Sequence, residues 1–388
     1  MNPNPALGVV YHWLGGLASG SFYVPYRGVK RWSWETYWLV GGVFSWIVAP
    51  WTLAFFLTND LGAVLAETPA STIFWAFFFG LLWGVGGLTF GLTMRYLGLS
   101  LGMAVVMGLC AAFGTLMPPI FRGVFVTQVL DTASGRVILL GIGICLVGIA
   151  IAGLAGVIKE RSVPPAAQQA AIKEFNLKKG LIVATLSGVM SACFAYGLAA
   201  GDPIKQLTLL HGTATLWQGL PVLVVVLLGG FATNFVWTVL LNARNRTGHQ
   251  YFSARCQVAT AQPSPHHTEE VAFTGPTAGV LTATTSTLIQ DTVRVPLLFN
   301  YLLCAIAGVT WYMQFFFYTM GETQMGAYKF SSWTIHMASI IIFSTLWGIG
   351  LNEWKGAGKP ALRLLALGLA VLIVSTVIIG YGNYLGAG

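Results

Sequence analysis

The sequence predicts an all-α membrane protein with ten transmembrane helices arranged as two inverted five-helix repeats. Of its 388 residues, 56% are hydrophobic and only 8% are charged, whereas soluble domains carry about 25% charged residues. Apolar stretches recur along the whole chain, and they reach the roughly 20 residues that a helix needs to cross a bilayer. The two halves also show weak internal similarity. These three observations exclude an ordinary water-soluble globular protein.

Hydropathy divides the chain into ten predicted spans. They cover residues 7–26, 36–58, 71–95, 97–121, 136–158, 179–200, 217–241, 297–321, 330–350 and 363–385. No basic segment precedes the first span, so we expect that span to be a retained helix rather than a cleaved signal peptide.

The basic residues between the spans predict how the helices are oriented. Sixteen of the twenty Lys and Arg lie in the connections after spans 1, 3, 5, 7 and 9, and four lie in the other connections. Because cytoplasmic loops carry the excess of positive charge, both termini are expected outside the cytoplasm. The net charge of +8 is therefore interpreted as a topology signal. The expected surroundings are a lipid bilayer, and nucleic acid is not an expected partner.

Weak self-similarity divides the chain into two halves. A shift of 172 residues aligns Gly8, Leu14, Gly16, Ser19 and Phe22 with Gly180, Leu186, Gly188, Ser191 and Phe194, and a shift of 227 aligns Arg136, Leu140, Gly141 and Gly153 with Arg363, Leu367, Gly368 and Gly380. We expect a first repeat at 7–158, a cytoplasmic linker at 159–178 and a second repeat at 179–385. The second repeat contains a long hydrophilic cytoplasmic loop, 242–295, for which no fold is predicted. Because each half has an odd number of helices, the halves are inverted, which places a binding site near the midplane between them.

One motif suggests catalysis. Gly98-Leu99-Ser100-Leu101-Gly102 matches G-x-S-x-G, which requires a strand-to-helix turn to expose the serine. Here it lies between two apolar spans, so a glycine-rich helical hairpin is predicted. No catalytic residue is assigned, although a serine hydrolase that uses Ser100 stays open as an alternative. The sequence has no Walker A loop, no H-E-x-x-H motif and no paired cysteine spacing, so no cofactor and no metal site are expected.

Two histidines lie within predicted spans, His12 in the first and His336 in the ninth. Ionisable groups at membrane depth are costly and by default indicate function, and histidine exchanges a proton near physiological pH. Each is predicted to lie about 8 to 9 Å inside the outer end of its helix, and Gln314 in the eighth span about 10 Å inside the same face. We therefore expect the three side chains to share one level.

Aromatic residues accompany this polar level. Trp311 and Tyr318 are predicted on the helix face of Gln314, Trp333 stands three residues before His336, and Glu322 closes the outer end of the eighth span. An amide, two imidazoles and aromatic rings suit a neutral polyol such as a sugar. The predicted substrate-binding residues are Gln314, Trp311, Trp333, His12 and Tyr318, and the predicted proton-coupling residues are His336, His12 and Glu322. The alternative is that the histidines are interhelical hydrogen-bond partners and the aromatic rings only pack.

Several sequence strings are similar to those of a known family. They are Trp32-Ser33-Trp34-Glu35-Thr36, Gly91-Leu92-Thr93-Met94-Arg95-Tyr96-Leu97-Gly98, Glu174-Phe175-Asn176-Leu177-Lys178-Lys179-Gly180, Trp311-Tyr312-Met313-Gln314-Phe315-Phe316-Phe317-Tyr318, and Ser332-Trp333 followed by His336-Met337. The chain resembles the L-rhamnose/proton symporters of the drug/metabolite transporter superfamily from the first span to the last, with a break at 242–295. It departs from the family pattern at Tyr328-Lys329-Phe330, where the family has an acidic residue between the aromatics.

The resemblance implies ten helices in two inverted halves, uptake of L-rhamnose together with protons, and a bacterial inner membrane. We therefore predict a symporter for L-rhamnose or a related 6-deoxyhexose, multi-pass, with both termini periplasmic. A metabolite or drug exporter or exchanger on the same fold is the main alternative, because a fold does not fix substrate or direction. No acidic residue lies well inside a predicted span, which favours a neutral ligand over a cation. A sugar receptor that does not transport is a further alternative.

Overall fold

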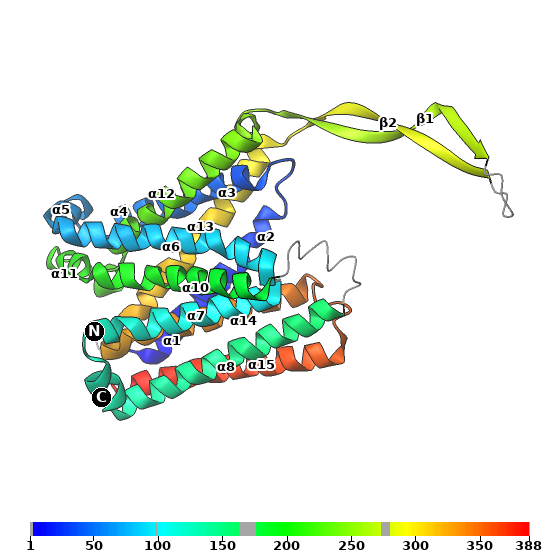
Figure 1. Cartoon of the computed structure of the whole chain (residues 1–388). Coiled ribbons are helices and arrows are strands. Elements are labelled where there is room, and N and C mark those ends of the chain that lie inside the picture. Colours follow the sequence, from blue (N-terminus) through cyan, green and yellow to red (C-terminus); the bar gives the residue numbers. More distant parts are fainter. Residues whose placement is uncertain (1–2, 98, 163–175, 273–279, 388) are drawn as a thin grey trace.

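The computed structural model describes residues 3–97, 99–162, 176–272 and 280–387. These residues form a bundle of long helices from which a two-stranded hairpin extends at one end (Figure 1). Nine of the helices in the described ranges are long and apolar enough to cross a membrane, and they coincide with nine predicted spans. The remaining predicted span, 7–26, is occupied by two shorter helices, α1 (Pro5–Ser21) and α2 (Tyr23–Tyr26). Phe22 between them keeps helical dihedral angles.

Six further α-helices and two π-helical turns make up the rest of the first half. They are α3 (Trp34–Val43), η1 (Phe44–Val48), α4 (Ala49–Leu57), α5 (Leu61–Glu67), α6 (Ala70–Leu97), α7 (Leu99–Phe121), η2 (Phe125–Leu130) and α8 (Ala133–Arg161). The π turn η1 lies just before Pro50, which has no backbone N–H and cannot continue the regular hydrogen-bond ladder of an α-helix. The second predicted span is therefore one helix with a local widening.

The second half contains six α-helices and three short 3₁₀ turns. They are α10 (Leu177–Ala200), α11 (Asp202–Leu210), η3 (Thr215–Trp217), α12 (Leu220–Asn245), η4 (Gly248–Tyr251), α13 (Leu297–Thr323), η5 (Gly326–Ser331), α14 (Ser332–Gly350) and α15 (Gly358–Leu385). Side-chain caps define three helix starts, because Asn4, Thr132 and Asn176 accept backbone N–H groups at the first turns of α1, α8 and α10. Asn and Thr are residue types that suit this position.

The hydrophilic stretch 242–295 has more structure than the sequence predicts. The helix α12 continues to Asn245, and two antiparallel strands follow, β1 (Arg255–Ala272) and β2 (Val280–Arg294). Threonine makes up five of the 15 residues of β2, and β-branched residues favour strands, whereas the Thr- and Ser-rich composition of the whole stretch predicts a loop. Outside this hairpin, the described residues form helices and the turns that connect them. His266 and His267 lie on β1, but their side chains are outside the described ones.

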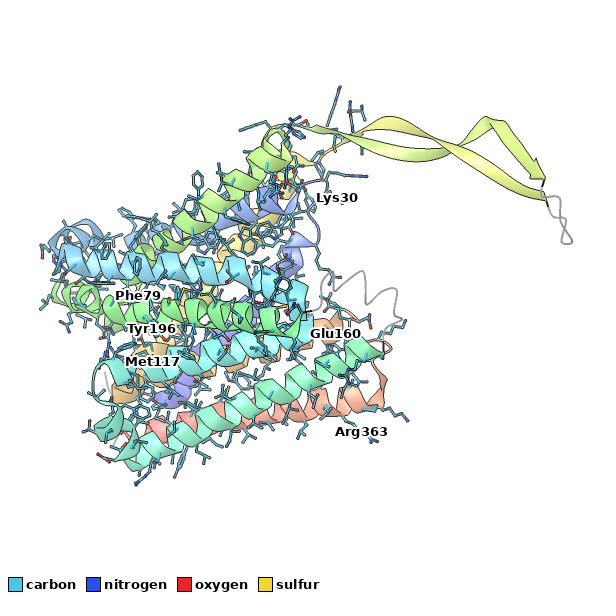
Figure 2. All side chains as sticks on the ribbon, in the orientation of Figure 1. Lys30, Phe79, Met117, Glu160, Tyr196 and Arg363 are labelled. Carbon is cyan, nitrogen blue, oxygen red and sulfur yellow. The ribbon has the colours of Figure 1, made fainter. Side chains whose placement is uncertain are left out.

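The hairpin and the chain termini lie at opposite ends of the bundle (Figure 1). Both chain termini lie at the end opposite the hairpin, together with α5 and α11 (Figure 1). Lys30 and Arg363, two basic residues for which the sequence predicts a cytoplasmic position, lie at the hairpin end (Figure 2). The hairpin end is therefore the end at which the predicted cytoplasmic charges gather.

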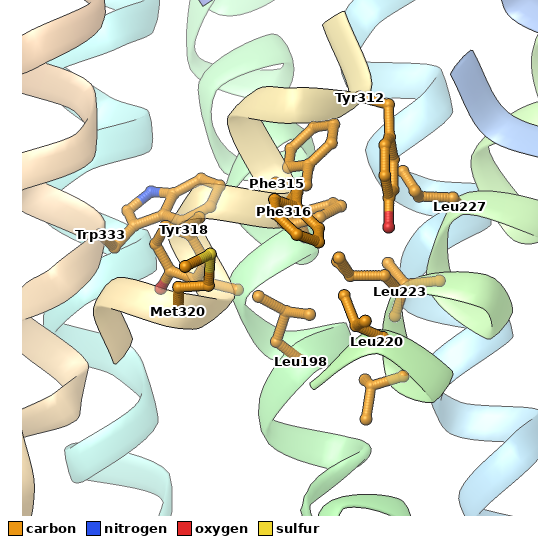
Figure 3. Close-up of a cluster of buried hydrophobic side chains, with 14 of the residues drawn as sticks. Leu198, Leu220, Leu223, Leu227, Tyr312, Phe315, Phe316, Tyr318, Met320 and Trp333 are labelled. Atoms are coloured by element: carbon orange, nitrogen blue, oxygen red, sulfur yellow. The ribbon is translucent and has the colours of Figure 1, made fainter. Parts of the chain in front are cut away.

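The helix α1 packs against both α13 and α14, and α10 packs in the same way against α6 and α7. Gly16 lets α1 approach α14 closely, because a Cβ atom there would lie 2.2 Å from Oγ of Ser339. Ser339 in turn donates a hydrogen bond to the backbone carbonyl of His12 at 2.9 Å. A core of buried hydrophobic side chains surrounds α13 (Figure 3). Because α1 packs against both α13 and α14, His12 on α1 is fully buried in the bundle.

Candidate functional site

Two fully buried histidines form the centre of the candidate site. His12 on α1 and His336 on α14 both have no exposed surface, and their ring centroids are 6.4 Å apart. The His12 ring lies on the backbone of α13, where a Cβ atom at Gly321 would be 2.7 Å from its Cε1 atom. None of the four ring nitrogens has a hydrogen-bond partner among the described residues. Leaving buried polar atoms unpaired costs about 1–3 kcal/mol each, so this pair is a candidate for binding a ligand or a proton.

Two aromatic side chains enclose the histidine pair. The Tyr318 ring on α13 lies 5.2 Å from the His12 ring and 5.3 Å from the His336 ring, measured between centroids. The Trp333 ring is 5.7 Å from Tyr318 and 6.3 Å from His336, and Figure 3 shows Trp333 beside Tyr318. The Trp333 indole donates a hydrogen bond to the Cys110 carbonyl of α7 at 3.0 Å. Four of the predicted site residues, from α1, α13 and α14, are thereby brought together.

Gln314 lies next to this group, one turn before Tyr318 on α13. A Cβ atom at Gly15 would be 2.9 Å from the backbone oxygen of Gln314 and 3.1 Å from Cε1 of His336. The absence of a side chain at Gly15 therefore lets α13 and the His336 ring meet. The Gln314 side chain is almost fully buried. Its amide forms no side-chain hydrogen bond within the part of the chain that the structure describes, so it is available to a ligand.

Trp311 is placed apart from the histidines. Its ring packs against Phe22, Trp46 and Trp83 at centroid distances of 5.2, 5.9 and 6.0 Å. Phe315 and Phe194 connect it to the first group, because Phe315 contacts Trp311 at 5.5 Å, Phe194 contacts Phe315 at 4.3 Å and Trp333 contacts Phe194 at 5.8 Å. His12, His336 and Gln314 therefore lie together, whereas Trp311 belongs to a neighbouring group that aromatic rings join to them.

Glu322 is held in an ion-pair network at the end of the bundle opposite the hairpin (Figure 1). Its carboxylate lies 2.8 Å from the Lys205 ammonium, which also lies 3.2 Å from Asp202. Asp202 additionally pairs with Arg122 and with Lys329, the latter at 3.1 Å. Glu322 directly follows Gly321, on which the His12 ring rests. Glu322 is thus one residue away from the position on α13 that the His12 ring contacts, but its carboxylate is paired with Lys205.

Asp202 and Lys205 lie in a connection between predicted spans, and the sequence patterns assign them no functional role. Both side chains are largely buried, with Lys205 8% and Asp202 22% exposed. The spacing Asp202-x-x-Lys205 directly after an apolar span was the available signal, because residues three apart on a helix can pair. Lys329, the position that departs from the family pattern, is one of the partners of Asp202.

A second charged contact joins α5 to the end of α11. The two ring nitrogens of His211 lie 3.4 Å from an Asp60 carboxylate oxygen and 3.1 Å from one of Glu67. Hydrogen bonds to Glu67 and Asp60 raise the pKa of His211 above its usual value. His211 lies between two apolar segments, outside the candidate membrane spans. It is a surface contact rather than part of the histidine site.

The described residues of the remaining motifs form no second chemical site. The backbone of Ser100 belongs to helix α7, whereas its side chain and Gly98 lie outside what the structure describes. In the described ranges no group of three His, Cys, Asp or Glu side chains is placed to hold a metal ion.

Sequence comparisons identify relatives over nearly the whole chain. The family model of the L-rhamnose-proton symport protein matches residues 1–264 and 283–384. Proteins described as L-rhamnose-proton symporters, from Salmonella typhimurium (strain LT2) and Salmonella newport (strain SL254), are each 34% identical over 377 residues, covering 97% of this chain and 97% of the relative. The match is interrupted at 265–282, inside the hairpin. This interruption is narrower than the break at 242–295 that the resemblance suggested.

Proposed function

The chain belongs to the L-rhamnose-proton symport protein family, and we propose that it is a secondary active transporter that carries L-rhamnose, or a related 6-deoxyhexose, into the cell together with protons. Membership in a symporter family makes it a transporter and not an enzyme. Its several apolar helices make it a multi-pass membrane protein. The buried, unpaired histidine pair is the observation that links this function to particular residues.

In the proposed site the sugar supplies the hydrogen bonds that the protein lacks. Hydroxyl groups both donate and accept, so they pair with the free nitrogens of His12 and His336 and with the Gln314 amide. The C–H edges of a pyranose ring pack on the rings of Trp333 and Tyr318, as apolar edges do on aromatic faces. A neutral ligand fits because no carboxylate contacts the two imidazole rings in the described part of the structure.

His336 and His12 are the proposed proton carriers. A protonated imidazole donates from both nitrogens, and neither ring forms a hydrogen bond with the described residues. Proton uptake therefore accompanies opening of the site to water or entry of the sugar. Glu322 is assigned a supporting role, because its carboxylate is already paired with Lys205. One charge that moves inward gains about 2.3 kcal/mol per 100 mV, which sustains roughly a fiftyfold sugar gradient.

We further propose that ten helices form two inverted repeats, 7–158 and 179–385, joined by the linker 159–178. The packing supports this arrangement. The first helix of the first half contacts α13 and α14, the third and fourth long helices of the second half, and α10 contacts α6 and α7, their counterparts in the first half. The last helices of the halves, α8 and α15, contact each other. Such exchanged contacts are what a pseudo-twofold axis in the membrane plane produces.

The proposed location is the bacterial inner membrane, with both termini periplasmic and the hairpin end in the cytoplasm. The gathering of basic residues such as Lys30 and Arg363 at the hairpin end supports this orientation. Membership of the drug/metabolite transporter superfamily belongs to the same proposal. In the proposed transport cycle, rocking of the two halves exposes the histidine site alternately to each side of the membrane.

External pH tests the proposed function directly. L-rhamnose is added to a weakly buffered, de-energised suspension of cells that produce the protein. Proton symport predicts alkalinisation of the medium, which is absent in cells without the protein and abolished by a protonophore. Entry of labelled L-rhamnose without a pH change would show a facilitator or another coupling ion. No entry at all would show that the substrate is wrong.

A further inference from the structure

A narrow pocket lies apart from the histidine pair, between α2, α3, η1 and α13. We call it the tryptophan pocket, and its side chains are Phe22, Tyr26, Trp38, Ser45, Trp46 and Trp311, with backbone from Gly41, Gly42 and Gly308. None of these residues carries a charge. The pocket is therefore suited to a neutral ligand with an apolar surface.

Three hydrogen-bonding groups of this pocket are buried and unused. The indole nitrogens of Trp46 and Trp311 and the hydroxyl of Ser45 have no hydrogen-bond partner among the described residues. Trp46 and Ser45 are only 3% and 2% exposed, so water outside the protein does not compensate them. Trp38 differs, because its indole donates to the Asn234 side chain at 3.1 Å. Three unpaired groups around one pocket indicate a missing polar partner.

Two of these three residues belong to an irregular turn that lines the pocket. Ser45 and Trp46 lie in the π turn η1, and single π turns often occur at functional sites because they redirect side chains. The Trp46 ring lies over Gly42, where a Cβ atom would be 2.5 Å from the ring. Gly308 of α13 likewise meets the carbonyl of Gly41, with 2.2 Å between that oxygen and a Cβ atom at Gly308. The two helices therefore meet through backbone rather than through interlocked side chains.

The tryptophan pocket lies nearer the hairpin end than the histidine pair does. Phe22 follows His12 by ten residues along the first helical segment, which is about 15 Å. Trp311 precedes Tyr318 by seven residues on α13, which is about 10 Å. Phe315 and Phe194 continue the aromatic surface from Trp311 to Trp333. The tryptophan pocket and the histidine pair are thus connected by a continuous row of aromatic rings.

We propose that the tryptophan pocket is a second sugar subsite, which holds the pyranose ring of a neutral 6-deoxyhexose between the histidine pair and the hairpin end. This inference rests on the proposed function. The indoles of Trp46 and Trp311 donate to sugar hydroxyls, and the Ser45 hydroxyl donates or accepts. The C–H face and the methyl group pack on the aromatic rings. In this conformation the pocket has a volume of about 10 Å³, which is room for one water molecule, so sugar entry requires α3 and α13 to separate where their backbones meet at Gly41 and Gly308.

The variant Ser45→Ala tests this proposal with the smallest perturbation. If the hydroxyl has only a packing role, its removal leaves stability unchanged or improved and transport unaffected, because an unpaired buried polar group is unfavourable. A subsite predicts something different: unchanged stability together with weaker sugar binding. Loss of one hydrogen bond to the sugar raises the half-saturating L-rhamnose concentration about five- to tenfold. Trp46→Phe, which removes one N–H and keeps an aromatic ring, has the same expected effect.

The measurement is counterflow of labelled L-rhamnose in proteoliposomes that contain the full chain, with melting temperature recorded for each variant. Thr58→Val is the matched control, because the Thr58 hydroxyl is also buried and unpaired in the described structure but lies outside the pocket. Its half-saturating concentration is expected to equal that of the wild type. The proton-to-sugar ratio is expected to stay unchanged in Ser45→Ala, since the histidines are intact.

The outcomes separate this proposal from the proposed function. A wild-type protein that transports L-rhamnose, with Ser45→Ala and Trp46→Phe indistinguishable from Thr58→Val, would overturn the second subsite and leave symport intact. A wild-type protein that moves no L-rhamnose would overturn the proposed function and this inference with it. If Trp46→Phe fails to fold, Ser45→Ala decides the question alone.

Discussion

Replacement of Lys205 by methionine tests the ion-pair network that joins Lys205 to Glu322 and Asp202. Methionine keeps the length of the side chain but removes the ammonium group that contacts Glu322 at 2.8 Å and Asp202 at 3.2 Å. Asp202 retains Arg122 and Lys329, whereas Glu322, only 14% exposed, keeps no ion-pair partner in the described structure. Breaking a buried pair costs about 3–5 kcal/mol. Because the Glu322 side chain keeps some contact with solvent, we expect a loss of unfolding free energy at the lower end of this range, about 3 kcal/mol.

Thermal unfolding in detergent measures this cost. At about 2 °C per kcal/mol, a loss of about 3 kcal/mol lowers the melting temperature by about 6 °C. The double variant Lys205→Met with Glu322→Gln removes the unpaired charge, and it is expected to recover a substantial part of that loss. Exposed Lys359→Met serves as the control. A melting temperature of Lys205→Met within about 1 °C of the control would refute the argument that this network is buried and stabilising.

Two further predictions concern packing and pH. Gly16→Ala places a Cβ atom 2.2 Å from Ser339 Oγ and is expected to cost about 1–3 kcal/mol by overpacking, whereas Gly62→Ala, which meets nothing within 4 Å, leaves the melting temperature unchanged. The carboxylate partners of His211 raise its pKa above the usual value. The contact therefore contributes its whole stabilisation below about pH 6.5, the usual pKa of histidine in an unfolded chain, and loses it as the pH rises through the higher pKa of the folded state. Melting curves of wild type and His211→Asn therefore differ at about pH 5.5 and converge at about pH 9, and a difference that grows with pH would contradict this reasoning.

The lengths and positions of the long helices could be predicted because bilayer thickness sets them. The predicted span 136–158 corresponds to α8 at Ala133–Arg161, and the small difference reflects polar ends that hydropathy does not detect. The structure of the first span was harder to predict, because α1 is only 17 residues long and reaches membrane-spanning length only together with α2. The hairpin was missed because threonine-rich sequence is common to loops and strands.

Part of the candidate site could also be predicted, because polar residues at membrane depth are few. His12 and His336 meet in the structure, as their common level suggested, and the Tyr318 ring lies against both. Trp311 could not be placed by spacing alone: α13 is surrounded by other helices, so side chains three positions apart contact different partners. The π turn η1 and the pairing of Lys205 with Glu322 depend on tertiary contacts, which the sequence pattern does not contain.

Accumulation of labelled L-rhamnose in proteoliposomes with an imposed inward proton gradient tests the central claim most directly. With one proton per sugar, a gradient of one pH unit sustains about a tenfold accumulation, which is released when a protonophore is added. His336→Gln is expected to abolish this accumulation while sugar exchange across the membrane continues. Equilibration of L-rhamnose without accumulation in the wild type, or full accumulation in His336→Gln, would contradict proton coupling through the histidine pair.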